Sequence, residues 1–110
     1  MLKKIIMYVV AFASFYAKAD YQTVDGIEWC YSASSYRAEV EGISSYHYEP
    51  IEVTIPSVLG GVPVNAIEYG AFRNCDFLLS VVISGAVEYI YDGAFEDCDR
   101  LMSVTIPNSV

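Results

Sequence analysis

Three cysteines and one histidine are the residues of this chain whose chemistry suits a transition metal. Cys30, Cys75 and Cys98 are 45 and 23 positions apart, and His47 is the single histidine among 110 residues. Structural zinc sites use pairs of ligands separated by roughly two to four residues, because a short loop then holds both donors against one ion. The spacing supplies no such pair, so we expect no metal site and no bound cofactor.

A serine, a histidine and an acid lie close together in the segment from Ser44 to Glu49, around His47. Nucleophilic hydrolysis needs these groups in one hydrogen-bonded relay, and closeness in sequence does not create that geometry. A run of polar and aromatic residues between two strand-like segments is more typical of an exposed loop. We therefore expect no catalytic residues and a protein that is not an enzyme.

Four acidic residues near the C-terminus raise the alternative of a calcium site: Asp92, Glu96, Asp97 and Asp99. A calcium-binding loop alternates its carboxylates and carries a glycine at its sharp turn. This group lacks that spacing, so we interpret it as a solvated convex edge.

The elements that hold these residues come from an internal repeat. Residues 67–75 and 90–98 carry Ile, Gly, Ala, Phe and Cys at matched positions, each pair 23 apart. The same offset relates 81–83 to 104–106. Self-similarity at a fixed period of roughly 20–50 residues is typical of a solenoid. Such a repeat predicts a protein that presents a surface.

An earlier, less regular copy begins at Val53, and the step from its Ile55 to Ile83 is longer than the step from Ile83 to Ile106. The extra residues fit an insertion around Leu59-Gly60-Gly61-Val62-Pro63, and both Gly-Gly and Val-Pro favour a turn. We therefore place the insertion in a loop between two strands.

Strands are favoured over long helices after residue 19, because the chain holds ten tyrosines and many valines and isoleucines. The repeated Ala-Phe-x-x-Cys phrase spaces its apolar residues as one helical turn does. We therefore expect short helical turns in a β-rich solenoid. The expected strands are Ile27–Ser32, Ala38–Glu41, Glu52–Ile55, Ser80–Ile83 and Ser103–Ile106, with shorter extended pieces near Ile67 and Ile90.

Within each repeat strand, two apolar side chains alternate with one polar or small neighbour, which predicts inward and outward positions. Stacked repeats would then form ladders of equivalent residues. The expected inward residues are Val53, Ile55, Val81, Ile83, Val104 and Ile106, joined by the pairs Ile67 with Ile90, Phe72 with Phe95 and Leu78 with Leu101.

The outward positions of the same strands form two columns. Parallel strands of a solenoid line a concave face that commonly binds partners. These side chains are therefore candidate partner-binding residues, although they equally suit a curved, half-exposed sheet without a partner. The columns are Glu52, Ser80 and Ser103, and Thr54, Val82 and Thr105.

From Val53 to Val110 the repeats resemble the BspA-like, or Treponema-type, leucine-rich repeat family. The resemblance is carried by Ala-Phe-x-x-Cys at 71–75 and 94–98 and by Val-Thr-Ile-Pro at 53–56 and 104–107. Ser84 departs from the pattern, where the family usually has proline. Residues 25–31 resemble the aromatic leader strand that often precedes such arrays. The resemblance implies a leucine-rich-repeat solenoid and, in some members, contact with extracellular or host proteins.

The repeat places Cys75 and Cys98 at equivalent positions on adjacent rungs. A rung spacing of ~4.8 Å allows a disulfide between them. The family resemblance implies instead that each is a small buried hydrophobe with a free thiol. Cys30 either packs within its strand or pairs between chains.

The N-terminal segment 1–19 has the pattern of a secretory signal peptide. Lys3 and Lys4 precede an apolar run from Ile5 to Tyr16, and Ala17-Lys18-Ala19 is a small-residue cleavage site. The run is shorter than the ~20 residues of a membrane-spanning helix, so we expect no membrane span.

Removal of that segment leaves three arginines against 14 acidic residues, a formal charge of −11. Such a surface repels phosphate, so we expect no nucleic-acid partner and no anionic membrane. Calcium or a basic patch on another protein remains open.

The predicted organisation is a signal peptide (1–19), an N-terminal β leader or cap (20–52), and leucine-rich repeats (53–110) comprising about two repeats and a truncated third. The predicted function is a secreted or cell-surface, non-catalytic module for protein binding or adhesion. The alternative is a purely structural cap or a fragment of a longer array without binding activity. We also expect self-association through an uncapped C-terminal edge.

Overall fold

The computed structural model describes residues 19–110, so the predicted signal peptide lies outside the described residues except for Ala19. All regular structure in this part of the chain is β. No helix within residues 19–110 is long and apolar enough to cross a membrane. The strands are β1 (Asp20–Val24), β2 (Ile27–Ala33), β3 (Ala38–Ile43), β4 (Ile51–Thr54), β5 (Val58–Leu59), β6 (Val62–Ile67), β7 (Leu78–Val82), β8 (Tyr89–Ile90) and β9 (Ser103–Thr105).

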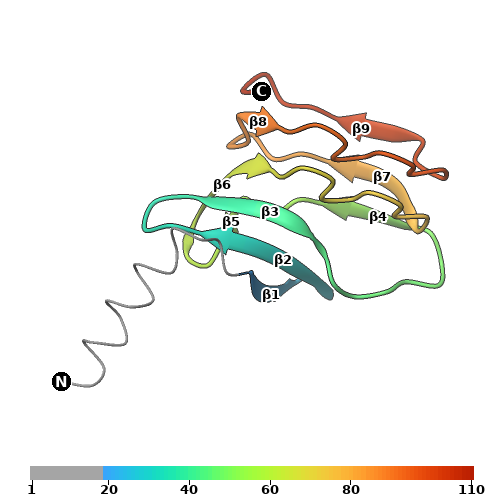
Figure 1. Ribbon diagram of the computed structural model, residues 1–110, viewed down its shortest axis with the longest axis horizontal. Coiled ribbons are helices and arrows are strands. Elements are labelled where there is room, and N and C mark those ends of the chain that lie inside the picture. The colour runs from blue at the N-terminus through green and yellow to red at the C-terminus, as the bar shows by residue number, and fades with distance from the viewer. Residues whose placement is uncertain (1–18) are drawn as a thin grey trace.

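These strands form two sheets, which are the two sides of a solenoid (Figure 1). One sheet is parallel and has the order β4-β7-β9, with one strand from each repeat. The other has the order β1-β2-β3-β6-β5, and β8 also pairs with β6. In it, the antiparallel leader β1-β2-β3 continues into the parallel strands β6 and β8. The leader therefore covers the first repeat as an extra rung.

Strands occur at all seven places where the sequence predicts extended structure, whereas β1 and β5 are additional. The predicted insertion forms a tight hairpin between β5 and β6. Gly60 and Gly61 are its two turn residues, with φ of 61° and 76°. Positive φ at both central residues matches the right-handed twist of hairpin strands, and glycine adopts it without steric cost. The turn prediction is thus confirmed, although Leu59, Val62 and Pro63 belong to the strands.

The short helical turns expected at the Ala-Phe-x-x-Cys phrases do not form, and residues 19–110 contain no helix. Each phrase instead makes successive β-turns, such as those closed by Arg73 N to Gly70 O and Cys75 N to Phe72 O. A helix is interrupted because Gly70 has φ of 59° and Asn74 has φ of 58°. The next repeat has the same backbone at Gly93 and Asp97. Left-handed φ at these positions replaces the helical turn.

Between the two sheets, the core follows the predicted ladders in the first rungs. The Phe72 and Phe95 rings stack with centroids 5.3 Å apart, and Trp29 of β2 meets Phe72 edge-on at 6.2 Å. Trp29 and Phe72 are fully buried, while Phe95 is half-buried. The inward prediction for Ile106 is wrong, because its side chain is 57% exposed. No rung within residues 19–110 covers that side of it.

Replacement of Phe72 by alanine should lower the free energy of unfolding by about 3–5 kcal/mol, since it empties a closed site between two other rings. The same change at half-buried Phe95 should cost less. Urea denaturation followed by circular dichroism measures both values. Equal or negligible effects of the two substitutions would contradict the role assigned to this ring stack.

Three glutamates, Glu39, Glu41 and Glu68, lie on the side of the six-stranded sheet that faces away from this core. A hydrogen bond to Glu39, burial, and the charges of Glu39 and Glu41 raise the pKa of Glu68 from its usual 4.5 to about 7. Two neighbouring carboxyl groups share one proton more readily than both of them ionise, because two negative charges side by side repel each other. The folded chain therefore binds this proton more tightly than the unfolded chain does.

The stability contributed by the Glu68 proton is complete below pH 4.5 and is lost as the pH rises through about 7. Glu68→Gln should match the parent near pH 4.5 and be more stable than the parent near pH 8, because glutamine imitates the protonated acid. Urea melts at both pH values test this. Glu52→Gln, which removes one charge from the other sheet, is the control, and the same pH response in both variants would refute the coupling.

Candidate partner-binding face

The six candidate residues lie on β4, β7 and β9, in the two columns that the sequence predicts. The parallel register pairs Glu52 with Ser80, and Ser80 in turn with Ser103. It likewise pairs Thr54 with Val82, and Val82 with Thr105. We call these six residues the column face. The strands hold them in line because Val53 and Val81, between the columns, point into the core and are buried.

The column face is open and built from short side chains. Five of its residues are exposed, and Ser80 is half-buried. Threonine and serine hydroxyls donate and accept hydrogen bonds, Val82 adds an apolar contact, and Glu52 adds one negative charge. Short side chains let another protein approach the strands closely. This chemistry suits recognition of a polypeptide surface.

A hollow of about 420 Å³ lies at the Thr54 end of the column face. Val24 and Asp25, from the turn between β1 and β2, line one side of it. Ser84 lines it too, and the Ser84 hydroxyl oxygen is buried without a hydrogen-bond partner in the described residues. The sequence did not indicate this hollow, since the leader turn is far from Thr54 along the chain and meets it only through folding. The one sequence feature that could have pointed to this hollow is Ser84, which stands where repeats of the resembled family usually have proline.

The other residues with reactive side chains are held in separate structural contacts. Ser45 Oγ lies 3.0 Å from His47 Nε2, but Ser44 instead donates to the Glu28 carboxylate. The His47 ring packs 5.3 Å from Phe77. The two ion pairs found within residues 19–110 join arginines to glutamates, and neither includes His47. A serine and a histidine therefore touch here without the acid that orients a catalytic relay.

The cysteines are three free thiols. Burial, with Cys98 and Asp76 nearby, raises the pKa of Cys75 to about 11, and burial also raises the pKa of Cys98. Cys98 Sγ donates a hydrogen bond of 2.9 Å to the Phe72 carbonyl. Burial and the Glu41 carboxylate raise the pKa of Cys30. Because the thiolate is the reactive form, these shifts favour packing over nucleophilic chemistry.

The described part of the chain contains no cluster of side chains suited to bind a metal ion. Within residues 19–110, no three His, Cys, Asp or Glu side chains gather closely enough to hold an ion. Of the four acids weighed for calcium, Asp92, Asp97 and Asp99 are exposed, and Glu96 pairs with Arg73 at 3.2 Å.

Comparisons with known proteins agree with this architecture. Among solved structures, a leucine-rich repeat protein from Bacteroides ovatus superposes with a TM-score of 0.67 and 30% identity, over 81% of this chain and 24% of that one. The leucine-rich repeat protein of T. pallidum superposes with a TM-score of 0.63 and 22% identity, over 84% of this chain and 38% of that one. The chain thus spans about a quarter of the Bacteroides protein. A search of curated proteins gave no match.

The family model described as "BspA type Leucine rich repeat region (6 copies)" matches residues 35–110. That range contains both equivalent phrases, the parallel sheet β4-β7-β9 and the stacked rings of Phe72 and Phe95. The chain belongs to the BspA-type leucine-rich repeat family.

Proposed function

We propose that this chain is a secreted or surface-displayed, non-catalytic module that binds extracellular proteins through the column face. The observation that carries the proposal is the pair of straight columns of short, exposed side chains across β4, β7 and β9. Proteins of the repeat class commonly use such a strand face for partner binding. Secretion is supported by the N-terminal pattern of Lys3 and Lys4, an apolar run and a small-residue cleavage site.

The composition of the column face supports binding over catalysis. Its one charged residue is Glu52, which the register pairs with Ser80, and no histidine, lysine or cysteine is among its six residues. A protein partner would gain backbone and hydroxyl hydrogen bonds there, together with apolar contact at Val82. The alternative is a purely structural cap within a longer array, without binding activity of its own. Binding by the isolated chain separates the two.

The variant Thr54→Arg with Val82→Arg and Thr105→Arg should abolish capture of a partner, because three long cationic side chains fill one column of the face. The fold should persist, since all three side chains are exposed. The assay is a pull-down from extracellular-matrix and cell-surface proteins, with circular dichroism to verify folding.

The matched control is Thr23→Arg with Ser35→Arg and Asn108→Arg, which adds the same charge at exposed positions outside the column face. This control should retain the captured protein. Equal capture by the parent and both variants would refute the column face as the binding surface. Failure of the parent to capture any protein would favour the structural alternative.

We also propose that the isolated chain self-associates through its last rung. Met102 is 82% exposed, Ile106 is 57% exposed, and β9 pairs with β7 alone among the described strands. An open strand edge beside exposed apolar side chains is a template for pairing with another chain.

Sedimentation velocity should therefore show a mass that rises with protein concentration over a range of roughly ten- to a hundredfold. The double substitution Met102→Lys with Ile106→Lys should shift the chain toward monomer, since charge on an edge opposes pairing. A parent that stays monomeric over that range would overturn the proposal.

A further inference from the structure

Three tyrosines form an exposed ladder on the outer side of the six-stranded sheet. The rings of Tyr69 and Tyr91 stack with centroids 5.0 Å apart, and Tyr89 continues the stack 6.3 Å from Tyr91. The planes are nearly parallel, at 28° and 16°. Tyr69 is nevertheless 66% exposed and Tyr89 50% exposed. Both end rings of the ladder are thus accessible to another molecule, whereas Tyr91 is held between them.

The sheet register places Glu39 and Glu68 on the same side of the sheet as this ladder. Glu39 of β3 is aligned with Ala66 of β6, which is aligned with Tyr89 of β8. Ala66 is only 1% exposed although it is not part of the central core cluster, so neighbours on the outer face cover it. Two residues further along, Glu68 N donates to the Val40 carbonyl and Tyr91 N to the Ile67 carbonyl. These bonds put Glu68 between β3 and Tyr91.

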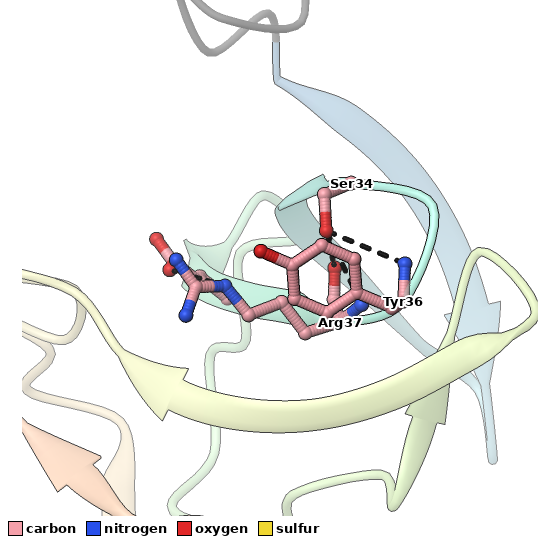
Figure 2. Close-up of polar contacts among 4 residues, drawn as sticks. Ser34, Tyr36 and Arg37 are labelled. Carbon is pink, nitrogen blue, oxygen red and sulfur yellow. Dashed lines mark hydrogen bonds and ion pairs between the residues drawn. The ribbon is translucent and has the colours of Figure 1, made fainter.

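This outer face carries more negative charge than its own cations balance. Arg37 reaches Glu39 at 3.6 Å, with nearly half of its side chain exposed. The turn that presents Arg37 is closed by Ser34, whose Oγ accepts hydrogen bonds from the Tyr36 and Arg37 backbone nitrogens (Figure 2). Glu68 lies close enough to Glu39 and Glu41 for their charges and a contact with Glu39 to raise its pKa to about 7, and neither of the two ion pairs found within residues 19–110 includes Glu68. A cation from outside would replace the proton of Glu68.

The arrangement selects the type of cation. A metal ion needs ligands converging on one point, and no such group of three exists within residues 19–110. A guanidinium group is planar, stacks on tyrosine rings and pairs with carboxylates through two parallel hydrogen bonds. An ammonium group lacks the plane and the paired donors. Rings and carboxylates side by side on a flat sheet therefore fit arginine better than lysine.

We infer that the outer face of β3, β6 and β8 is a second docking surface, which binds an arginine-bearing segment of a partner protein through the ladder of Tyr69, Tyr91 and Tyr89 and the adjacent Glu39, Glu41 and Glu68. The guanidinium stacks on an end ring of the ladder and pairs with the carboxylates. This surface belongs to the sheet opposite the column face, so it does not depend on the function proposed for that face.

The test uses fluorescein-labelled hexa-arginine and hexa-lysine peptides, with fluorescence anisotropy of the purified chain at low ionic strength. Hexa-arginine should bind more tightly than hexa-lysine. Tyr69→Leu and Tyr89→Leu should each weaken hexa-arginine binding by about two- to fivefold, because each removes one exposed cation–π partner and leaves the net charge unchanged. Both side chains are at least half exposed, so the variants should fold, and circular dichroism verifies this.

The controls separate recognition from simple charge attraction. Tyr48→Leu removes an exposed tyrosine from the loop before β4, away from the ladder, and should leave binding unchanged. At pH 8, where Glu68 is ionised, Glu68→Gln should weaken binding more than Glu52→Gln, although each then removes one negative charge. Equal effects within either pair, or equal affinity for the two peptides, would overturn the inference. Tyrosine-dependent binding of maltohexaose without such binding of hexa-arginine would also overturn it, because the ladder would then be a carbohydrate platform.

Discussion

Burial of one aromatic column joins the leader to the repeats, and the rest of the structure depends on it. A single rung of a solenoid cannot bury its own apolar face, so each rung needs a neighbour. Here β2 of the leader supplies Trp29 as the neighbour of Phe72, and Phe95 of the next rung stacks on the other side. Because all three rings belong to different rungs, displacing one exposes the faces of the others.

At position 29, the free energy gained by burying the tryptophan ring exceeds the cost of leaving its indole nitrogen without a hydrogen-bond partner. Trp29 Nε1 is buried with no hydrogen-bond partner among the described residues. An unpaired buried donor costs about 1–3 kcal/mol. A buried aromatic side chain removes roughly 150–250 Å² from water, which at about 25 cal/mol per Å² contributes ~4–6 kcal/mol as an upper estimate. Apolar burial therefore outweighs the lost hydrogen bond.

The two sheets of the solenoid present different chemistry to solvent because they receive different residues from the repeat. The parallel sheet β4-β7-β9 exposes serine, threonine and valine in columns. The outer face of β3, β6 and β8 exposes glutamates and stacked tyrosines. Backbone turns with positive φ at Gly70 and Gly93 return the chain from this face to the next strand of the parallel sheet. One repeat thus supports two surfaces, one nearly neutral and one acidic and aromatic.

The sequence alone determined the repeat, the family, the strand positions and the columns, because the repeat period and the alternation along each strand are local, regular signals. It was wrong where the backbone breaks the period of a helix: the apolar spacing of Ala71, Phe72 and Cys75 fits a helical turn, but left-handed φ at Gly70 and Asn74 prevents one. It was also wrong at Ile106. The alternation along the strand predicts a buried side chain there, but the side chain is exposed because no rung within residues 19–110 covers it.

Tertiary structure decided everything that joins distant segments. The contact of Trp29 with Phe72, the hollow between the leader turn and Thr54, and the coupling of Glu39 to Glu68 each unite residues that lie far apart in the sequence. The sequence contains no periodic signal for how the leader strands align with the repeat strands, because the leader is not itself a copy of the repeat. Its position is set by how β3 pairs with β6 and by how Trp29 fills the end of the core, and both become defined only when the chain packs.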